Sequence, residues 1–238
     1  MLVRLRSFLN PTDSARLCRR VFWVAFLVRV LYMTLAHTYR FRVTEDHFQF
    51  GWEAGRIARA LVTGHGYADP FANAYLSHTG PTAWLPPLYP LLIAAVFRIF
   101  GVYTHTSAWV LLTINSAFSA ATAVAVWQIA NRCFNRRVAL WSAWLWALYP
   151  AAMQYAVRWP WEMTITTALF SFTLVLALHM RGVGGDVTYK SPRINQWLLF
   201  GLLWGLIALS NATLLIFLPV CGLWILLPSL RACSRSSE

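Results

Sequence analysis

Carboxylates are scarce in this sequence, so their positions indicate where chemistry could occur. Only eight of the 238 residues are Asp or Glu. Asp46 and Glu53 are seven residues apart, and a continuous helix would place both on one face. Glu162 ends the stretch RWPWE, four residues after Arg158. Converging carboxylates can act as general base, metal ligand or cation clamp, so these three acids are the candidate catalytic residues. The alternative for Glu53 is a solvated charge paired with neighbouring arginines.

Three further polar residues are candidates for binding a substrate. Arg158 could contact a phosphate, or it could anchor the chain at a membrane surface. His47 directly follows Asp46. Asn211 lies in a short turn, where it could orient a polar headgroup or cap the turn. Four histidines lie between residues 39 and 106: His47, His65, His78 and His105. Their spacing is not that of metal ligands, so no metal site is predicted.

The composition is typical of a membrane protein. Hydrophobic residues make up 58% of the chain and charged residues 12%, and the mean hydropathy is +0.53. A soluble domain carries about twice that charged fraction. The net charge of +12 resides in short basic clusters between apolar runs. This placement indicates loops at an anionic cytoplasmic surface and argues against a nucleic-acid partner. The four cysteines form no metal or disulfide pattern.

The stretch GPTAWLPPLYPLLIAAVFRIFG (80–101) decides the topology. If it crossed the membrane, the basic loops 131–137 and 181–196 would face outward, against the positive-inside rule. Three prolines at its start restrict a regular helix to about Pro90–Phe100, roughly 16 Å and about half of the hydrocarbon core. We therefore predict an interfacial helix here, with Trp84 and Tyr89 in an aromatic belt. A buried re-entrant helix is the alternative.

The predicted fold is an all-α polytopic membrane protein with about six transmembrane helices in a single domain, 1–238. The first span occupies 20–38, a large extracytoplasmic loop with interfacial helices occupies 39–106, and five further spans lie within 107–230. A cytoplasmic tail follows at 231–238. Both termini are then cytoplasmic, in a multi-pass protein of the inner (plasma) membrane.

Three details of these segments are also predicted. One of the further spans is predicted at the apolar stretch Val138 to Val157. An amphipathic helix in the first loop carries Ile57 on its apolar stripe and Arg56 elsewhere, and glycines end it. Arg29 lies inside the first span, where a charge is costly, and it is either functional or reaches back to the basic edge of the membrane.

The order of these segments resembles a known family. The first span is followed by GWEAGRIARALVTGHGYADPF and GPTAWLPPLYPLLIAAVFRIFG, and later by NRCFNRRVALWSAWLWALYP, RWPWEMTITTALFSFTLVLAL and LLFGLLWGLIALSNATLLIFLPVCGLWIL. Together they resemble the GT-C membrane glycosyltransferases, especially the aminoarabinose-transferase and protein O-mannosyltransferase-like group. The resemblance covers about residues 20 to 230.

The resemblance implies an activity and its participants. The donor would be a polyprenyl-phosphate-linked sugar, transferred with inversion to a lipid, glycan or protein acceptor at the outer face of the membrane. Asp46 or Glu53 would be the first-loop acid, with the local motif favouring Glu53, and Glu162 the second acid. No cofactor is firmly implied, and a divalent metal stays open. Membrane lipids and the lipid-linked sugar are the expected partners.

The sequence also departs from the family pattern. Relatives often carry a Lys before the Pro-Pro pair, where this chain has Trp84 and Leu85, so Arg158 is expected to contact the donor phosphate. Relatives are also longer, so a truncated enzyme, or a non-catalytic scaffold with a partner subunit, is the alternative hypothesis. A small transporter ranks third, because Arg29, Asn115 and Gln128 are among few polar groups within the spans.

Overall fold

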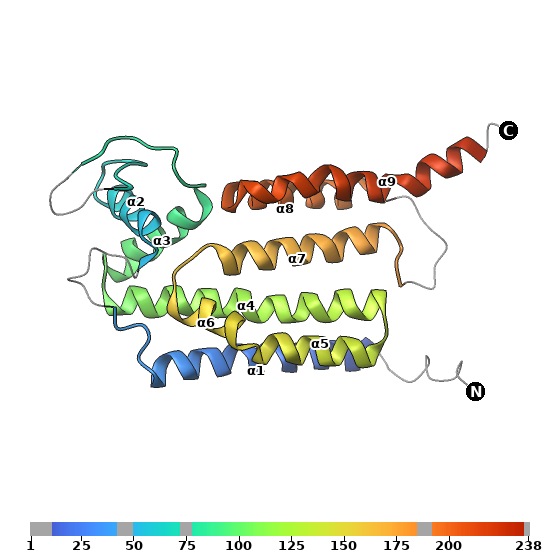
Figure 1. Cartoon of the computed structure of the whole chain (residues 1–238), viewed down its shortest axis with the longest axis horizontal. Helices are drawn as coiled ribbons and strands as arrows, with labels where there is room; N and C mark the ends of the chain where they lie inside the picture. Colours follow the sequence, from blue (N-terminus) through green and yellow to red (C-terminus); the bar gives the residue numbers. More distant parts are fainter. Residues whose placement is uncertain (1–10, 42–49, 72–77, 185–191, 236–238) are drawn as a thin grey trace.

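The computed structural model describes residues 11–41, 50–71, 78–184 and 192–235, which form a helical bundle (Figure 1). Its elements are α1 (Pro11–Leu35), α2 (Glu53–Val62), α3 (Leu88–Phe100), α4 (His105–Cys133), α5 (Arg136–Leu148), α6 (Pro150–Arg158), α7 (Met163–Met180), α8 (Ile194–Ser210), the 3-10 helix η2 (Ala212–Ile216) and α9 (Phe217–Arg235). The described residues contain no β-strand and one isolated bridge, between Ala68 and Pro81. The predicted all-α class is confirmed.

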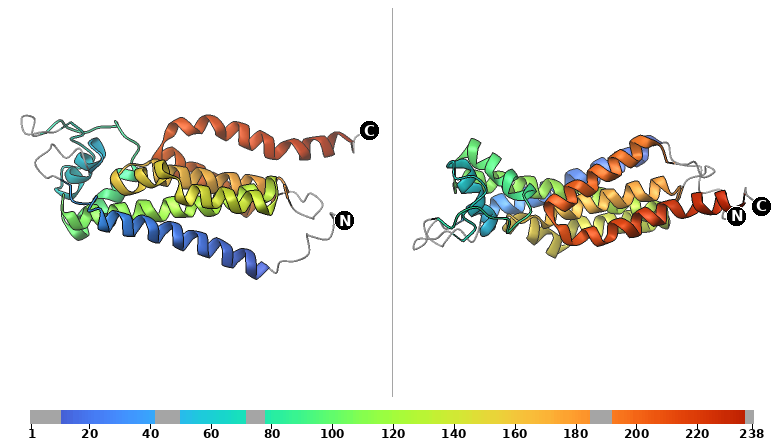
Figure 2. Two further views of the ribbon diagram at one scale, coloured as in Figure 1. Left: turned by 60° about the horizontal axis from the view of Figure 1, so that its bottom comes forward. Right: turned by 90° about the horizontal axis from the view of Figure 1, so that it is seen from above.

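The long helices lie side by side, and α2 and α3 cover one end of the bundle. Figure 1 shows α1, α4, α5, α7, α8 and α9 along the long axis, and the views in Figure 2 agree. We call the end with α2 and α3 the cap end; the α6–α7 and α8–η2 connections lie there too. The opposite end, which we call the terminal end, carries the start of α1, the end of α9, the α4–α5 connection, the end of α7 and the start of α8.

The helices have the character of membrane spans. Among the described residues, α4 and α7 are long and apolar enough to cross a bilayer, and α3, α8 and the stretch Ala212–Leu227 are apolar but shorter. Large apolar side chains are exposed along the sides of the bundle, as lipid contact requires: Trp141, Leu145, Leu198, Leu202, Val220 and Leu223. The predicted helical membrane protein is confirmed. Its six predicted spans correspond to α1, α4, α5 with α6, α7, α8, and η2 with α9.

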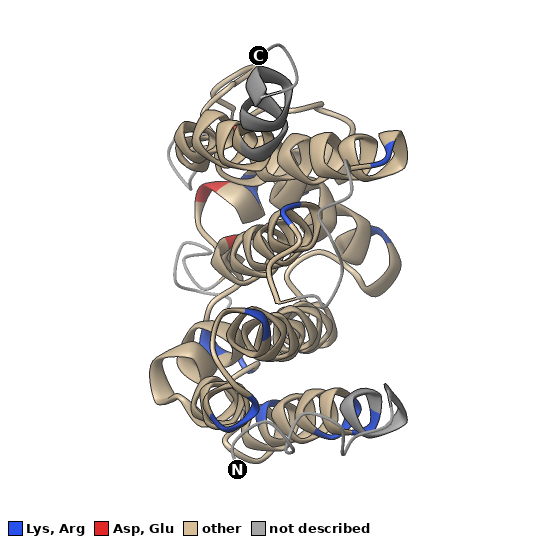
Figure 3. Cartoon of the chain, turned by 90° about the vertical axis from the view of Figure 1, so that its right-hand side faces the viewer, with Lys and Arg blue, Asp and Glu red and all other residues tan. Residues whose placement is uncertain are grey.

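Helix α4 is the centre of the bundle, because it packs against α1, α3, α5, α6 and α7. Its contact with α1 and α5 is built mainly from buried small residues: Ala25, Ala120, Ala123, Ala139, Ala143 and Ala147. Small side chains let helix backbones approach closely, which is how helices gain van der Waals contact in lipid. The basic side chains of the α4–α5 connection are Arg132, Arg136 and Arg137, at the terminal end. Figure 3 views the molecule from that end, with Lys and Arg in blue.

The span predicted at Val138–Val157 consists of two helices, because the chain breaks at Pro150. Helix α5 ends at Leu148 and α6 begins at Pro150, with Tyr149 in an extended conformation (ψ 118°) between them. Proline disfavours helical geometry in the residue before it and has no N–H to donate back into the helix. The break leaves carbonyl groups at the end of α5 without intrahelical donors.

Arg29 of α1 supplies hydrogen bonds at this break. Its Nη1 donates to the Ala147 carbonyl at 2.7 Å, and its Nη2 donates to the Trp146 carbonyl at 3.3 Å. Nε donates to Ser119 Oγ of α4 at 3.1 Å. The residue is fully buried, so the expectation that it reaches back to the basic edge is wrong. A guanidinium at a helix C-terminus also meets the negative end of the helix dipole.

The cap end is held by an aromatic cluster. Phe50 packs edge-on against Phe41, Phe97 and Tyr103, with ring centroids 4.9 to 5.5 Å apart.

Helix α3 has 13 residues, about 20 Å, and starts two residues before the predicted Pro90. Its interfacial position in a membrane stays a prediction. Tyr89 is 2% exposed, so its predicted place in an aromatic belt is wrong, whereas Trp84 is 61% exposed.

Candidate functional site

Glu162 lies at the cap end, on the turn between α6 and α7. Its backbone carbonyl accepts the first hydrogen bond of α7, from Thr166 N at 2.9 Å. The side chain is half-buried. Burial raises the pKa of this carboxyl above its usual range, because the charged form loses hydration. A carboxylate with a raised pKa takes up a proton more readily at neutral pH than an exposed one.

A buried hydrogen-bond network braces this turn. Asn115 of α4 donates from Nδ2 to Tyr89 Oη at 3.0 Å and to the Trp159 carbonyl at 3.2 Å. Burial raises the pKa of Tyr89, and the nearby charge of Glu162 raises it further. The network therefore joins α3 and α4 to the turn that carries Glu162. Sequence reasoning missed it, since Asn115 lies 26 residues from Tyr89 and 44 from Trp159.

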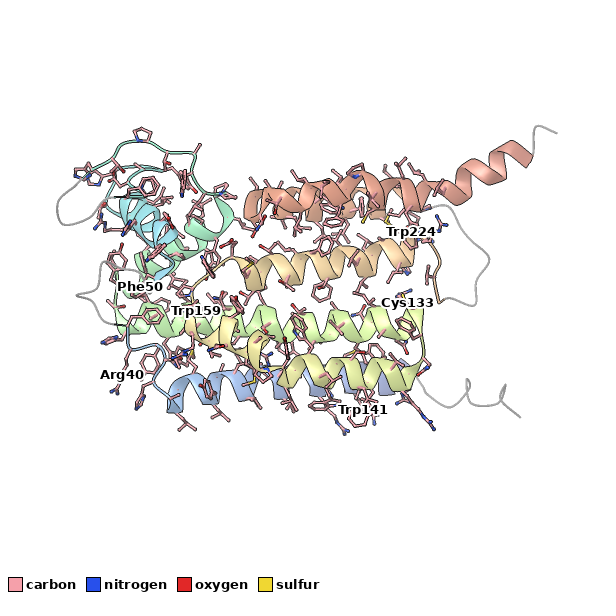
Figure 4. All side chains as sticks on the ribbon, viewed as in Figure 1. Arg40, Phe50, Cys133, Trp141, Trp159 and Trp224 are labelled. Atoms are coloured by element: carbon pink, nitrogen blue, oxygen red, sulfur yellow. The ribbon has the colours of Figure 1, made fainter. Side chains whose placement is uncertain are left out.

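The segment before Glu53 contacts the same turn. Gly51 has φ +82°, and a Cβ on it would lie 2.3 Å from the Pro160 carbonyl oxygen. Gly51 is two residues before Glu53, and Pro160 is two residues before Glu162. The structure thus brings together the chain segments that carry these two acids, which are far apart in the sequence. In Figure 4 the labelled residues Phe50 and Trp159 both lie at the cap end.

The first turn of α2 has a fixed position. Tyr103 Oη donates to the Gly55 carbonyl at 3.2 Å, and a Cβ on Gly55 would lie 2.6 Å from the Phe50 carbonyl oxygen. Trp52 also has a positive φ, +48°. Helix α2 therefore begins at Glu53, and the continuous helix expected to align Asp46 with Glu53 is wrong. Asp46 and His47 lie outside the described residues.

Of the other predicted site residues, Arg158 is exposed and Asn211 caps a helix. Arg158 is the last residue of α6 and is exposed beside the Glu162 turn, where a ligand can reach it. Asn211 Oδ1 accepts from the Thr213 backbone N–H at 3.2 Å and so caps η2.

Arg56, predicted away from the buried stripe of α2, is 9% exposed and donates to the Pro70 carbonyl at 3.1 Å. That prediction is wrong.

A cavity of about 260 Å³ lies between α4, α5, α6 and the first turns of α7. Its lining combines hydroxyl and aromatic side chains: Ser119, Thr122, Trp146, Tyr155, Thr164 and Thr167. Thr164 follows Glu162 by two residues and is buried, and its hydroxyl has no hydrogen-bond partner among the described residues. Ser119 and Trp146 are also the residues that Arg29 contacts. No group of three or more metal-ligating side chains occurs in the described part of the chain.

The helical membrane fold, with the segments that carry Glu53 and Glu162 in contact at one end, is the architecture expected of a GT-C membrane glycosyltransferase. A family model, dolichyl-phosphate-mannose-protein mannosyltransferase, matches residues 85–237. The chain belongs to this family, and the resemblance to GT-C membrane glycosyltransferases is confirmed. The match includes Arg158, Glu162 and Asn211, whereas Asp46, His47 and Glu53 precede it. No curated protein and no solved structure matches the chain.

Proposed function

We propose that this protein transfers a sugar from a polyprenyl-phosphate donor to a hydroxyl or amine acceptor at the cap end of the bundle. The acceptor attacks C1 of the sugar, and the bond between C1 and the phosphate oxygen breaks. The acceptor proton passes to a carboxylate, and the lipid phosphate leaves. The family supplies the donor class, and the contact between the Glu53 and Glu162 segments is the observation that carries the proposal.

The proposed roles follow from where the side chains lie. Glu53 or Asp46 acts as the base, and Glu162 binds the acceptor or shares the proton, a role that its raised pKa favours. Arg158 steadies the charge of the donor phosphate, because a guanidinium can pair with two phosphate oxygens at once. His47 and Asn211 are proposed to contact polar groups of the substrates.

We infer that the cap end faces outward from an inner (plasma) membrane. The basic connections between α4 and α5 and between α7 and α8 lie at the terminal end, and they include Arg132, Arg136, Arg137, Arg181 and Arg193. Basic loops are retained in the cytoplasm. This orientation places both termini in the cytoplasm and the candidate acids Asp46, Glu53 and Glu162 outside.

The proposal is tested by measuring sugar transfer in membranes that contain the wild type, Glu53→Gln, Asp46→Asn or Glu162→Gln. Loss of a catalytic base or acid lowers rates by about 10² to 10⁴. We expect a loss of that size in Glu162→Gln and in one of the two first-loop variants. Equal rates in all three variants and the wild type would refute the assignment. Glu238→Gln, at the far end of the chain, is the control for expression.

A further inference from the structure

The outer face of α5 carries a groove that the proposed sugar transfer does not use. Its volume is about 580 Å³, and Trp141 in its wall lies at the outer edge of the bundle (Figure 4). Most of the side chains that line it are apolar or aromatic, and they include Val126 of α4 with Trp141, Trp144, Leu145, Leu148 and Tyr149. Trp141 and Leu145 are 69% and 68% exposed, so in a membrane the groove is open to the lipid chains.

A basic residue stands at one end of this groove. Arg137, in the first turn of α5, is exposed. It precedes Trp141 by four residues and Leu148 by eleven, so the helix places the three side chains on one face. The next charged residue along the chain is Arg158. The face is therefore basic at the terminal end, aromatic one turn further on, and apolar as far as the break at Pro150.

The length of this face matches one leaflet of a bilayer. From Arg137 to Leu148 the helix rises about 16 Å, at about 1.5 Å per residue. The hydrocarbon core is about 30 Å thick, so each leaflet contributes about 15 Å. The sequence of charge, aromatic ring and apolar surface is the order in which a phospholipid presents its phosphate, its ester groups and its acyl chains. Exposed Arg136 and the positive end of the α5 dipole strengthen the attraction for an anion at the headgroup level.

We propose that this face of α5 binds one anionic phospholipid of the leaflet at the terminal end, with the phosphate on Arg137 and an acyl chain in the groove. A guanidinium can bond two phosphate oxygens at once. A zwitterionic lipid is held less tightly, because its own ammonium group offsets the phosphate charge. The site is separate from the proposed reaction, whose second acid, Glu162, lies at the cap end.

Native mass spectrometry of the full-length protein in a non-ionic detergent tests this site. The anionic probe is dioleoylphosphatidylglycerol and the zwitterionic probe is dioleoylphosphatidylcholine. We expect one phosphatidylglycerol per chain to bind about fivefold more tightly than phosphatidylcholine, the effect of one basic residue near an anionic headgroup. Arg137→Gln should abolish this preference, and Arg137→Lys, which keeps the charge, should retain most of it. Arg193→Gln is the matched control, because Arg193 is exposed at the start of α8, across the bundle from α5 (Figure 1).

A second pair of variants separates the groove from the charge. Trp141→Ala removes one wall of the groove and should weaken the binding of both lipids alike. Trp23→Ala is its control, because Trp23 is exposed on α1 and does not line the groove. Both tryptophans and Arg137 are exposed, so each variant should unfold at the temperature of the wild type, which circular dichroism checks.

The outcomes that would overturn the proposal are specific. They are equal affinity of the wild type for the two lipids, and a preference for phosphatidylglycerol that persists in Arg137→Gln. Displacement of the lipid by an equal concentration of inorganic phosphate would show a site for a free anion instead. A dimer that excludes lipid from this face, detected by gel filtration, would show that a second copy of the chain occupies it.

Discussion

At the residue scale, the candidate chemistry depends on how Glu162 is held. The carboxyl sits on a turn whose Trp159 carbonyl is bound by Asn115, which also binds Tyr89. These contacts fix the position of Glu162, while partial burial raises its pKa. Position and proton affinity thus come from different neighbours, and each can be changed separately.

The raised pKa of Glu162 predicts a shifted acid limb in the pH–rate profile. Protonation removes the ionised carboxylate, so a rate that needs this form falls as the pH drops through the raised pKa. The fall should occur at a higher pH than for a solvent-exposed glutamate. Transfer rates measured from pH 4 to 8 check this, and in Glu162→Gln the acid limb should move to the lower pH at which the first-loop base is protonated. An acid limb at the ordinary glutamate value would contradict the effect of burial.

At the element scale, two breaks in regular structure shape the bundle. Gly51 interrupts the chain before α2 and touches the Pro160 carbonyl, and Pro150 separates α5 from α6. Arg29 provides donors at the second break from another helix. Both features couple segments that are distant in the sequence.

The close contact between Gly51 and the Pro160 carbonyl predicts that Gly51→Ala lowers transfer activity by more than backbone strain alone would. Gly51→Ala places a Cβ 2.3 Å from the Pro160 oxygen, so the segments before Glu53 and Glu162 must move apart. Gly64→Ala is the matched control, because Gly64 has φ +88° and open space around it. Each substitution carries about 1–3 kcal/mol of backbone strain. Transfer activity should fall well below the control in Gly51→Ala, and equal activities would show that the contact does not matter.

The Arg29 contacts predict that Arg29→Met lowers the stability of the protein, and that the size of this loss depends on the helix break at Pro150. Arg29→Met leaves the buried Ala147 carbonyl without its side-chain donor, at about 1–3 kcal/mol, whereas the Trp146 carbonyl keeps its bond from the Tyr149 N–H at 3.3 Å. Pro150→Ala restores a backbone N–H that can bond back into α5. Thermal unfolding in detergent should show a marked fall in Tm for Arg29→Met and partial recovery in the double variant. Additive effects would contradict the coupling, and exposed Arg98→Met is the control.

At the scale of the whole molecule, composition and the placement of basic loops predicted the all-α membrane fold. The same loops predicted that segment 80–101 is no ordinary span, and α3 lies at the cap end beside α2. What could not be predicted depends on long-range contacts. Arg29 bonds to residues 90 and 118 positions away, so its burial was not visible in the local pattern. Pro150 is visible in the sequence, but the apolar run around it does not show that the helix breaks there.

The proposed orientation of the whole molecule in the membrane predicts opposite accessibility for its two ends. Cysteines replacing Arg136, at the terminal end, and Arg158, at the cap end, both occupy exposed positions. In a background without the native cysteines, an impermeant thiol reagent added to intact cells should label the Arg158 position and leave the Arg136 position unlabelled. Labelling of the Arg136 position from outside would reverse the topology.

Sugar transfer in sealed vesicles of defined orientation tests the central claim most directly. Purified protein is reconstituted, and a polyprenyl-phosphate sugar and an acceptor extract are supplied on one side only. We predict transfer where the cap end faces the substrates, and a rate about 10² to 10⁴ lower with Glu162→Gln. Transfer at the terminal end, or undiminished transfer by Glu162→Gln, would contradict the account.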